Sequence, residues 1–426
     1  MNKNRKTYRK NKLDAPKTLF LDIKFSRMRR KFIAMVAIVC IIGACLACDK
    51  ILPKAPADDS ILDGPVEGLT NEEHGKFVRG DVAFNDEVFT RETGLGPLFV
   101  ANSCGSCHAG DGKGHPFTTL TRFGQSDTIE NLYMQKGGPQ LQHRAIPGFQ
   151  PELIPGGATF SSFTPPANTG LGFLDAVPDA VLLALADEND ANADGISGRP
   201  NWIRIPSYCL ERKNTIHRNG KYIGRFGKKA AVYDLLQQTV NAYNQDMGIN
   251  STYEHYNTYN GQDADAEVTN QTVQDLVFYL QTLKAPIQRL QNDADVVAGK
   301  QIFTNISCGK CHVSQMQTGE FPIAALSNKT FYPYSDFLLH DMGPGLDDHY
   351  TEGTALTAEW RTPPLWGLGL SKNSQGGNYF LLHDGRAKSI EEAILLHGGE
   401  ALTSKNKFQQ LSADEKGKLL KFLESL

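Results

Sequence analysis

The stretch CGSCH, Cys104 to His108, returns later in the chain as CGKCH, Cys308 to His312. Two cysteines at this spacing are typical of a disulfide or of half a zinc site, but neither explains the histidine that follows in both copies. Covalent haem attachment does explain it, because two thiols can bond the two vinyl groups of one porphyrin while the adjacent imidazole binds the iron. The sequence therefore predicts two covalently attached haem c groups, with His108 and His312 as proximal iron ligands.

The N-terminus predicts export. A basic flank precedes a short apolar run, Phe32 to Leu46, which is typical of a signal peptide and shorter than the roughly 20 apolar residues of a membrane span. The run ends in IGACLACDK, which resembles the lipobox of bacterial lipoproteins. Cys48 is the preferred lipidation site, Cys45 is the alternative, and an uncleaved membrane anchor is the other interpretation.

Processing at Cys48 would remove residues 1–47 and leave residues 48–68 as a linker. We then expect a protein exported from the bacterial cytoplasm and lipid-anchored to a membrane, facing the periplasm or the cell surface. Of the 44 basic and 47 acidic residues, 12 and 2 lie in the removed segment, so the mature chain has a net charge of −13. This charge argues against a nucleic-acid partner, and it suits either solubility or attraction of a basic redox protein.

The cysteine count agrees with haem attachment. Of 8 cysteines, three lie in the signal region and four in the two motifs. Only Cys209 is left, and a single cysteine cannot form an internal disulfide. We interpret Cys209 as structural.

Internal repetition indicates how the chain is divided. Aligning the two motifs also pairs Phe99 with Phe303, and two stretches with similar apolar spacing at helical period, Asp275–Leu283 and Lys418–Leu426, follow in the two halves. Each half thus supplies the closing helix of a small cytochrome domain. We expect haem c domains at residues 69–286 and 291–426.

The predicted fold class is mainly α, because long strand patterns are scarce. Further helices are expected at Asp179–Ala186, Ala230–Asn244 and Ser389–Leu396, and Ser412 with Glu415 predicts a capping box before the last helix. A Gly/Pro-rich insertion, Gly137 to Pro206, enlarges the first domain and should be mostly loop.

The chain resembles the di-haem oxidoreductase family, which is related to the bacterial di-haem cytochrome c peroxidases and to MauG-type enzymes. The resemblance spans nearly the whole mature chain. It is carried by GLGPLFVANSCGSCHAGDGKG from Gly94, DGISGRPN from Asp194, GRFGKKA from Gly224, QDMGIN from Gln245, LLHDMGPGL from Leu338, RTPPLWGLGL from Arg361 and LLHDGRAKSIEEAILLHGGEA from Leu381.

The resemblance implies that one haem stores an electron while the other reacts with hydrogen peroxide. In the related cytochrome c peroxidases a distal Met stands just before HDG, but Leu382 occupies that position here. Met247 in QDMG and Met342 in HDMG are the candidate substitutes as distal iron ligands, and His340 and His383 are alternatives. Either site could also be open.

Peroxide cleavage needs an acid/base group near the distal oxygen and a positive charge nearby. The candidates lie in HGGE, in HDG and in RTPP. They are His397, Glu400, His383, Asp384, Arg386 and Arg361. Arg361 has the alternative role of pairing with a haem propionate, and Trp360 and Trp366 flank the RTPP segment.

Residues Asp190 to Gly198, DANADGISG, resemble the first half of a calcium loop. Asp190, Asn192 and Asp194 are the candidate ligands, but the closing Glu of an EF-hand is replaced by Asn201. An acidic turn held by local hydrogen bonds is the alternative.

The sequence as a whole predicts a peroxidase-like oxidoreductase that takes electrons from a small cytochrome or another redox protein. Two other classes stay open. One is an electron relay in which both irons have six ligands, and the other is a tailoring oxidase of the MauG kind that acts on a protein. The loss of Met before HDG weakly favours classes that do not copy cytochrome c peroxidase.

Overall fold

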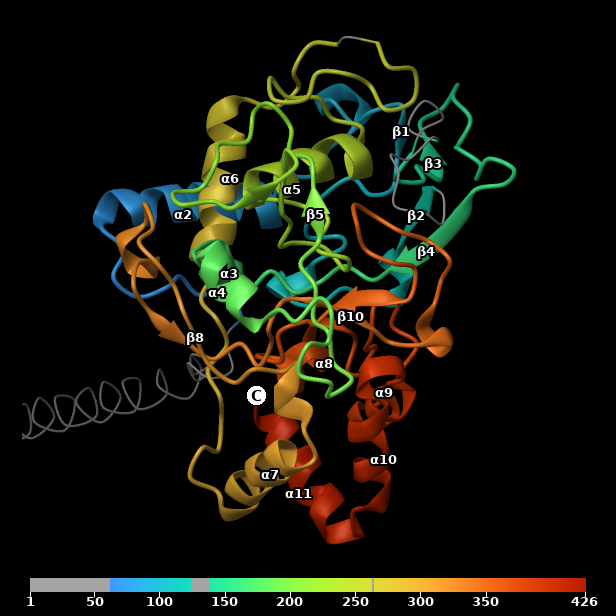
Figure 1. The fold of residues 1–426 in the computed structure, drawn as a ribbon. Coiled ribbons are helices and arrows are strands. Elements are labelled where there is room, and N and C mark those ends of the chain that lie inside the picture. The colour runs from blue at the N-terminus through green and yellow to red at the C-terminus, as the bar shows by residue number, and fades with distance from the viewer. Residues whose placement is uncertain (1–61, 125–132, 134–137, 263) are drawn as a thin grey trace, which may run out of the picture. The chain divides into compact units, whose positions relative to one another are not determined.

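The computed structural model describes residues 62–124, 133, 138–262 and 264–426 (Figure 1). The predicted signal region, both lipidation candidates and most of the linker lie outside the described residues. Within the described ranges, no helix is both long enough and apolar enough to cross a membrane.

Helices are distributed along the whole described chain. Their bounds are α2 Asn71–Asn85, α3 Leu171–Asp175, α4 Asp179–Leu185, α5 Leu235–Asn241, α6 Asn270–Thr282, α7 Ala294–Asn305, α8 Ser371–Ser374, α9 Ile390–Leu396, α10 Leu402–Gln410 and α11 Ala413–Ser425. The helices predicted around α4 and α9 are confirmed. The helix expected from Ala230 begins only at Leu235, because the Asp234 carboxylate caps it by accepting from the Gln237 amide.

In the described part of the chain, the strands are short and form five small antiparallel sheets. Their bounds are β1 Leu98–Phe99, β2 Leu120–Gly124, β3 Arg144–Ala145, β4 Thr159–Phe163, β5 Trp202–Ile203, β6 His217–Arg218, β7 Lys221–Ile223, β8 Met316–Gln317, β9 Thr330–Phe331, β10 Leu339–Asp341 and β11 Glu359–Arg361. Four sheets are the pairs β1–β3, β2–β4, β8–β9 and β10–β11, and the fifth has three strands in the order β5–β7–β6.

The fold is mixed, with about 35% helix and 11% strand, rather than simply mainly α. Strands of two to five residues are too short to show the alternation of apolar and polar residues by which strands are found in a sequence. The Gly/Pro-rich segment also contributes β4, which pairs with β2 from Leu120↔Phe163 to Gly124↔Thr159.

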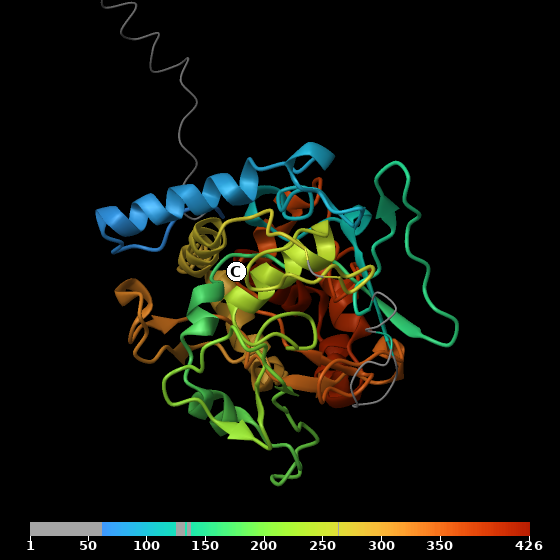
Figure 2. The same ribbon diagram turned by 90° about the horizontal axis from the view of Figure 1, so that it is seen from above.

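Two helix pairs repeat one arrangement. In the first, α2 packs on α6 (Figures 1 and 2), and in the second, α7 packs on α11 (Figure 1). Glycine permits each close approach. A Cβ added at Gly80 would lie 2.2 Å from the Asp275 carbonyl oxygen, and one added at Gly299 would lie 2.1 Å from the Lys418 carbonyl oxygen.

The repeat also places one phenylalanine beside each motif histidine. Phe84 of α2 lies 5.9 Å from the ring of His108, and Phe303 of α7 lies 6.4 Å from the ring of His312. The structural counterpart of Phe303 is therefore Phe84, and the pairing with Phe99 is wrong. The alignment fails because the first half has extra chain between its helix and its motif, and Phe99 lies in β1.

The core consists of two main clusters, one around each helix pair. The larger cluster surrounds α2 and α6, and it also includes Phe331, Phe337 and Trp366 from the second predicted domain. The smaller cluster joins α7, α9 and α11. Residues Asp58–Leu426 accordingly form one compact unit, and the predicted boundary near residues 286–291 stays a prediction.

The capping box at the last helix is confirmed. The Ser412 hydroxyl accepts from the Glu415 amide, and the Glu415 carboxylate accepts from the Ser412 amide. This cap fixes the start of α11, whose buried side chains Leu419, Phe422 and Leu423 face the second cluster. An equivalent box between Thr70 and Glu73 starts α2.

Candidate functional site

One cavity of about 420 Å³ reaches both CxxCH motifs. Its wall includes Cys104, Cys107 and His108 from the first motif. The same wall includes Cys308, Cys311 and His312 from the second motif. Most other side chains on the wall are apolar, which suits a large planar ligand with few polar atoms.

Each motif forms the same tight turn. The His108 amide donates to the Cys104 carbonyl at 3.0 Å, and the His312 amide donates to the Cys308 carbonyl at the same distance. All four thiols are free, so neither pair is a disulfide. Burial raises the pKa of Cys104 to about 12 and that of Cys107 to about 11, which keeps the thiols protonated.

The two motif histidines are neutral. Burial lowers the pKa of His108 and of His312 to about 4. The Nδ1–H of His312 donates to the Tyr334 carbonyl at 2.9 Å, which leaves a lone pair on Nε2. The Nδ1 of His108 is buried without a hydrogen-bond partner, beside the backbone of Pro166 and Gly112. Neutral imidazole is the form that binds iron.

Three neighbouring cations on the wall make no ion pair with another described residue. They are Lys113, Lys228 and Arg361. The charge of Asp384 acts on the two lysines, and that of Asp336 acts on Arg361. Burial lowers the pKa of Lys113 to about 7 and that of Arg361 to about 10, and burial with the two neighbouring cations lowers that of Lys228 strongly. Such a cluster would gain from an anion, and haem carries two propionates.

A carboxyl that the sequence did not single out lies beside the first motif. Asp246 ends the π-helical turn Ala242–Asp246 and lines the cavity, and burial raises its pKa to about 7. Its charge acts on both Cys104 and Cys107, so the carboxyl lies near both thiols. Met247 follows it, lines the cavity and is 2% exposed. The QDMG motif pointed to this place, and π-helical turns often mark functional sites.

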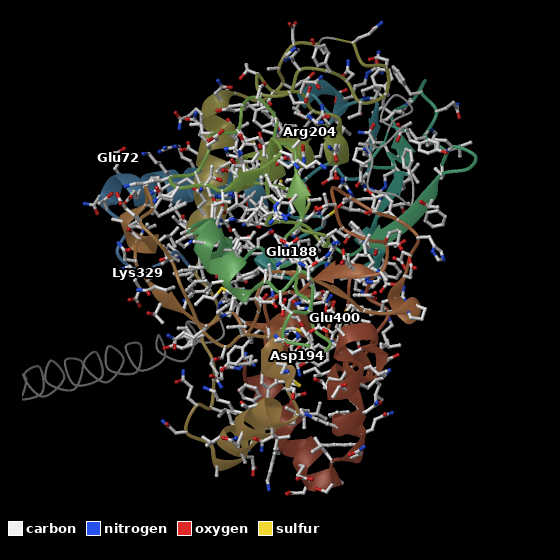
Figure 3. All side chains as sticks on the ribbon, in the orientation of Figure 1. Glu72, Glu188, Asp194, Arg204, Lys329 and Glu400 are labelled. Carbon is white, nitrogen blue, oxygen red and sulfur yellow. The ribbon has the colours of Figure 1, made fainter. Side chains whose placement is uncertain are left out.

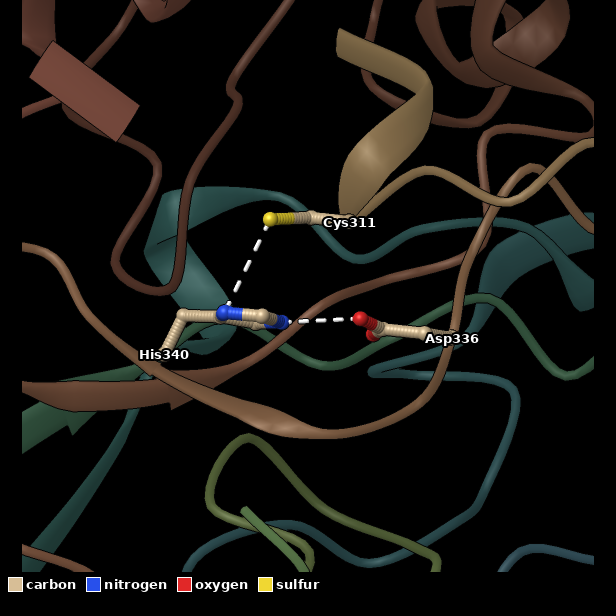
Figure 4. A group of neighbouring side chains, drawn as sticks. All are labelled: Cys311, Asp336 and His340. Carbon is tan, nitrogen blue, oxygen red and sulfur yellow. Dashed lines mark hydrogen bonds and ion pairs between the residues drawn. The ribbon is translucent and has the colours of Figure 1, made fainter. Parts of the chain in front are cut away.

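His340 is held between two carboxylates. Its Nε2–H donates to Asp336 at 2.8 Å, and its Nδ1–H donates to Glu400 at 2.6 Å. Burial opposes its charge, but these bonds raise its pKa well above the ordinary value. Cys311 Sγ lies 3.6 Å from Nδ1 (Figure 4). Cys311, Asp336 and His340 are close enough to hold a metal ion, although the imidazole is already used by the carboxylates.

Glu400 therefore joins two distant segments. Besides His340, its carboxylate accepts from the Ser197 hydroxyl at 2.6 Å and from the Ser197 amide at 3.1 Å. Figure 3 shows Glu400 near Asp194, which belongs to the same loop as Ser197. Its bonds tie the HGGE turn to the DGISG segment.

His383 lies in a stack of buried side chains. Its ring is 3.7 Å from the Trp360 ring at an interplanar angle of 7°, and its Nε2 is 2.8 Å from the Asp348 carboxylate. The Lys229 ammonium lies 3.9 Å from the centre of the Trp360 ring and donates to three backbone carbonyls. Trp360 Nε1–H donates to the Leu346 carbonyl at 2.7 Å.

The remaining candidates are divided between the wall and the surrounding network. Met342 and His397 line the cavity, and His397 Nδ1–H donates to the Ala393 carbonyl at 2.7 Å. Arg386 Nε–H instead donates to Asp384 at 2.6 Å, within the HDG turn.

The candidate calcium loop is held by its own hydrogen bonds. The Asp190 carboxylate accepts from the amides of Asp194 and Gly195, and the Asn192 side chain accepts from the Asp194 amide. The Asp194 carboxylate is 2.7 Å from the Lys310 ammonium. These bonds account for the loop as an acidic turn, and calcium stays a prediction.

The residues present fit haem. Each motif offers two free thiols and one neutral imidazole, and the unpaired cations face the same apolar cavity. A family model described as "Di-haem oxidoreductase, putative peroxidase" matches residues 163–426. The match covers more than half of the chain, so the protein belongs to this di-haem oxidoreductase family, and haem is its cofactor.

Two solved structures are similar at low identity. Hydrazine synthase of Kuenenia stuttgartiensis, pressurised with 20 bar xenon, is 14% identical over 88% of this chain and 98% of that chain, with a TM-score of 0.37. A MauG-like protein associated with microbial copper homeostasis is 15% identical over 88% of this chain and 94% of that chain, with a TM-score of 0.38. No curated protein matches the chain.

Proposed function

We propose that the protein reduces hydrogen peroxide with electrons that pass between two covalently attached haems. The observation that carries the proposal is the single cavity that both CxxCH motifs line. One continuous cavity would bring the two haems close enough for electrons to pass between them. Peroxide reduction takes two electrons, and two irons in one chain are a local reservoir for them.

The motif residues have distinct roles in this proposal. The thiols of Cys104 and Cys107 would hold one haem, and those of Cys308 and Cys311 would hold the other. When bound, haem supplies redox-active iron with a coordination position that can take peroxide. The imidazoles of His108 and His312 would be the proximal ligands of the two irons.

Other residues on the wall would position the haems and move protons. Lys113, Lys228 and Arg361 are suited to pair with the propionates, because no described carboxylate pairs with them. Asp246 is suited to give and take a proton near the first motif, because its pKa of about 7 leaves both forms populated at neutral pH. Met247 and Met342 are candidate distal ligands.

Haem content and peroxide turnover test this function. We expect two covalent haems per chain in the exported holoprotein, measured by the pyridine haemochrome spectrum after denaturation. Cys104→Ser with Cys107→Ser should leave one, and Cys308→Ser with Cys311→Ser should leave the other. Cys209→Ser is the matched control and should keep both haems.

Turnover separates the proposal from the electron relay. We expect peroxide-dependent oxidation of a reduced small cytochrome, and a high-spin iron in the fully oxidised or half-reduced protein by electron paramagnetic resonance. Two low-spin irons in both states, together with no peroxide consumption, would mean that the protein is a relay.

Export and lipidation belong to the same proposal. A lipidated Cys48 would hold the protein on a membrane, facing the periplasm or the cell surface, where it could meet its electron donor. Mass spectrometry of the mature N-terminus should find acylated Cys48, and Cys48→Ala should release the protein into the soluble fraction. An unmodified N-terminus at Met1 would contradict this.

A further inference from the structure

The cavity wall carries three histidines besides those of the motifs, and their ring nitrogens differ in use. Both nitrogens of His340 donate to carboxylates, and Nε2 of His383 is bonded to Asp348. His397 uses only Nδ1, which donates to the carbonyl of Ala393. Among these three, only His397 has a lone pair on Nε2 together with a fixed Nδ1 proton.

The position of His397 follows from α9. Ile390, Ala393, Ile394 and His397 all line the cavity, and their spacing puts them on one face of the helix. Because Nδ1 is turned back to the helix backbone, the Nε2 edge of the ring points away from the helix. His397 lies on the helix face that lines the cavity, so its Nε2 edge is directed toward the cavity.

His312 and His397 share one arrangement. Each ring donates its Nδ1 proton to a backbone carbonyl, Tyr334 for one and Ala393 for the other, and each lines the same cavity. Burial and then the Tyr334 carbonyl are the largest influences on the pKa of His312, and the ring of His397 follows as an electrostatic neighbour. A carbonyl that holds Nδ1–H is the usual support of a histidine that binds metal through Nε2.

We propose that Nε2 of His397 is the second axial ligand of the haem iron that His312 binds. The imidazole would take the place of the thioether that Leu382 does not supply. The inference rests on the proposed function, because it requires a haem on the second motif. An iron with two imidazole ligands passes electrons and has no open position. The reactive iron would then be the one on the first motif, beside Asp246.

Spin state tests this ligand directly. In the holoprotein with two haems, we expect His397→Gly to convert one iron per chain from low-spin to high-spin, measured by electron paramagnetic resonance of the oxidised protein. Added imidazole should restore the low-spin signal, because it can occupy the space that the side chain leaves. His349→Gly is the control, because this ring is exposed and does not line the cavity, so this variant should keep the spin state of both irons.

A second measurement does not depend on the variants. Near-infrared magnetic circular dichroism of the unmodified holoprotein distinguishes two imidazoles from imidazole with thioether, and we expect a band of the first kind. Two haems per chain with no such band, or no change of spin state in His397→Gly, would overturn the ligand assignment and leave the proposed function standing. A chain without covalent haem would instead overturn the proposed function.

Discussion

At the scale of single residues, Gly299 and Gly417 of the second helix pair show two different roles of glycine. Gly299 permits close packing, whereas Gly417 only lowers the helix propensity of α11. A Cβ at Gly299 would lie 2.7 Å from Phe422 Cβ as well as 2.1 Å from the Lys418 carbonyl oxygen. Gly417 of α11 is exposed and has nothing within 4 Å of an added Cβ. The same substitution should therefore have opposite effects at the two positions.

We expect Gly299→Ala to lower the free energy of unfolding by about 1–3 kcal/mol, because backbone must move to admit the methyl group. Gly417→Ala should raise it by roughly 0.5–1 kcal/mol through better helix propensity. Denaturant titration of both variants checks this. Equal effects would mean that the close approach of α7 and α11 does not limit the side chain at residue 299.

The second prediction at this scale concerns Asp246. Asp246→Asn keeps the shape of the side chain but cannot transfer a proton, so peroxide turnover should fall by about 10²–10⁴-fold. The haem content should stay at two per chain. Asn244→Asp is not a suitable control, because Asn244 donates to the Asn250 side chain. Gln245→Ala, one residue away, serves better, and a loss of turnover as large as that of Asp246→Asn would contradict the assignment.

At the scale of elements, a buried ion pair holds the start of α4. Arg225 and Asp179 are 2.5 Å apart and almost fully buried. Burial alone would raise the pKa of Asp179, but Arg225 and hydrogen bonds from Ile216 and Thr215 hold it below the ordinary value of 3.8. Removing one partner leaves an unpaired buried charge, which is costly.

We expect Arg225→Met to lower the free energy of unfolding by about 3–5 kcal/mol at pH 7. A depressed carboxyl pKa stabilises the fold above the unfolded value, and this stabilisation is lost as pH falls through the folded pKa. The gap between Arg225→Met and the unmodified protein should therefore narrow as the pH is lowered. Denaturant titrations at several pH values measure it. Lys213→Met, at an exposed ion pair with Glu320, should show no such gap.

Sequence reasoning found the elements with strong signals and missed those that depend on distant contacts. The Ser412 cap and the helix after Ser389 follow from local hydrogen bonds, so they were predictable. The strands were not, because pairs such as β10–β11 join segments that carry no local pattern. The counterpart of Phe303 could not be found either, because Phe84 is recognised only once α2 packs on α6.

The candidate site was predictable in part for a similar reason. The motif residues are contiguous in sequence, so their grouping was visible at once. The partners of Glu400, Asp246 and Lys228 come from other segments and are known only from the fold. Both His397 and His383 line the cavity, and it is the hydrogen bond from Nε2 of His383 to Asp348 that separates these two candidates, which the sequence offered as equivalent.

At the scale of the whole molecule, the three unpaired cations link the two halves. Lys113 follows the first motif, Lys228 lies between the motifs, and Arg361 follows the second. The charge of Lys228 acts on His108, and Lys113 and Arg361 act on Lys228, so the cluster can influence the haem site at the first motif. Substitution of Lys228 should therefore change the reduction potential of a haem, and not only the haem content.

We expect Lys228→Gln to lower at least one haem reduction potential by tens of millivolts, because a nearby cation disfavours the more positive ferric iron. Potentiometric titration followed by visible absorption measures the shift. Lys372→Gln, away from this cluster and over the Tyr379 ring, is the control. Unchanged potentials in Lys228→Gln would mean that the cation does not act on either haem.

The long distance in sequence between α2 and α6 also affects the order in which parts of the protein form during biosynthesis. As the chain emerges from its N-terminus, α2 and the thiols of Cys104 and Cys107 exist long before residues 270–282 are made. Contacts across so many residues form late and slowly. Under the proposed covalent attachment, the first motif would stay accessible to haem attachment until α6 has been made. The second motif ends at His312 and its helix α11 begins only at Ala413, so its interval would also be long, although shorter than that of the first motif.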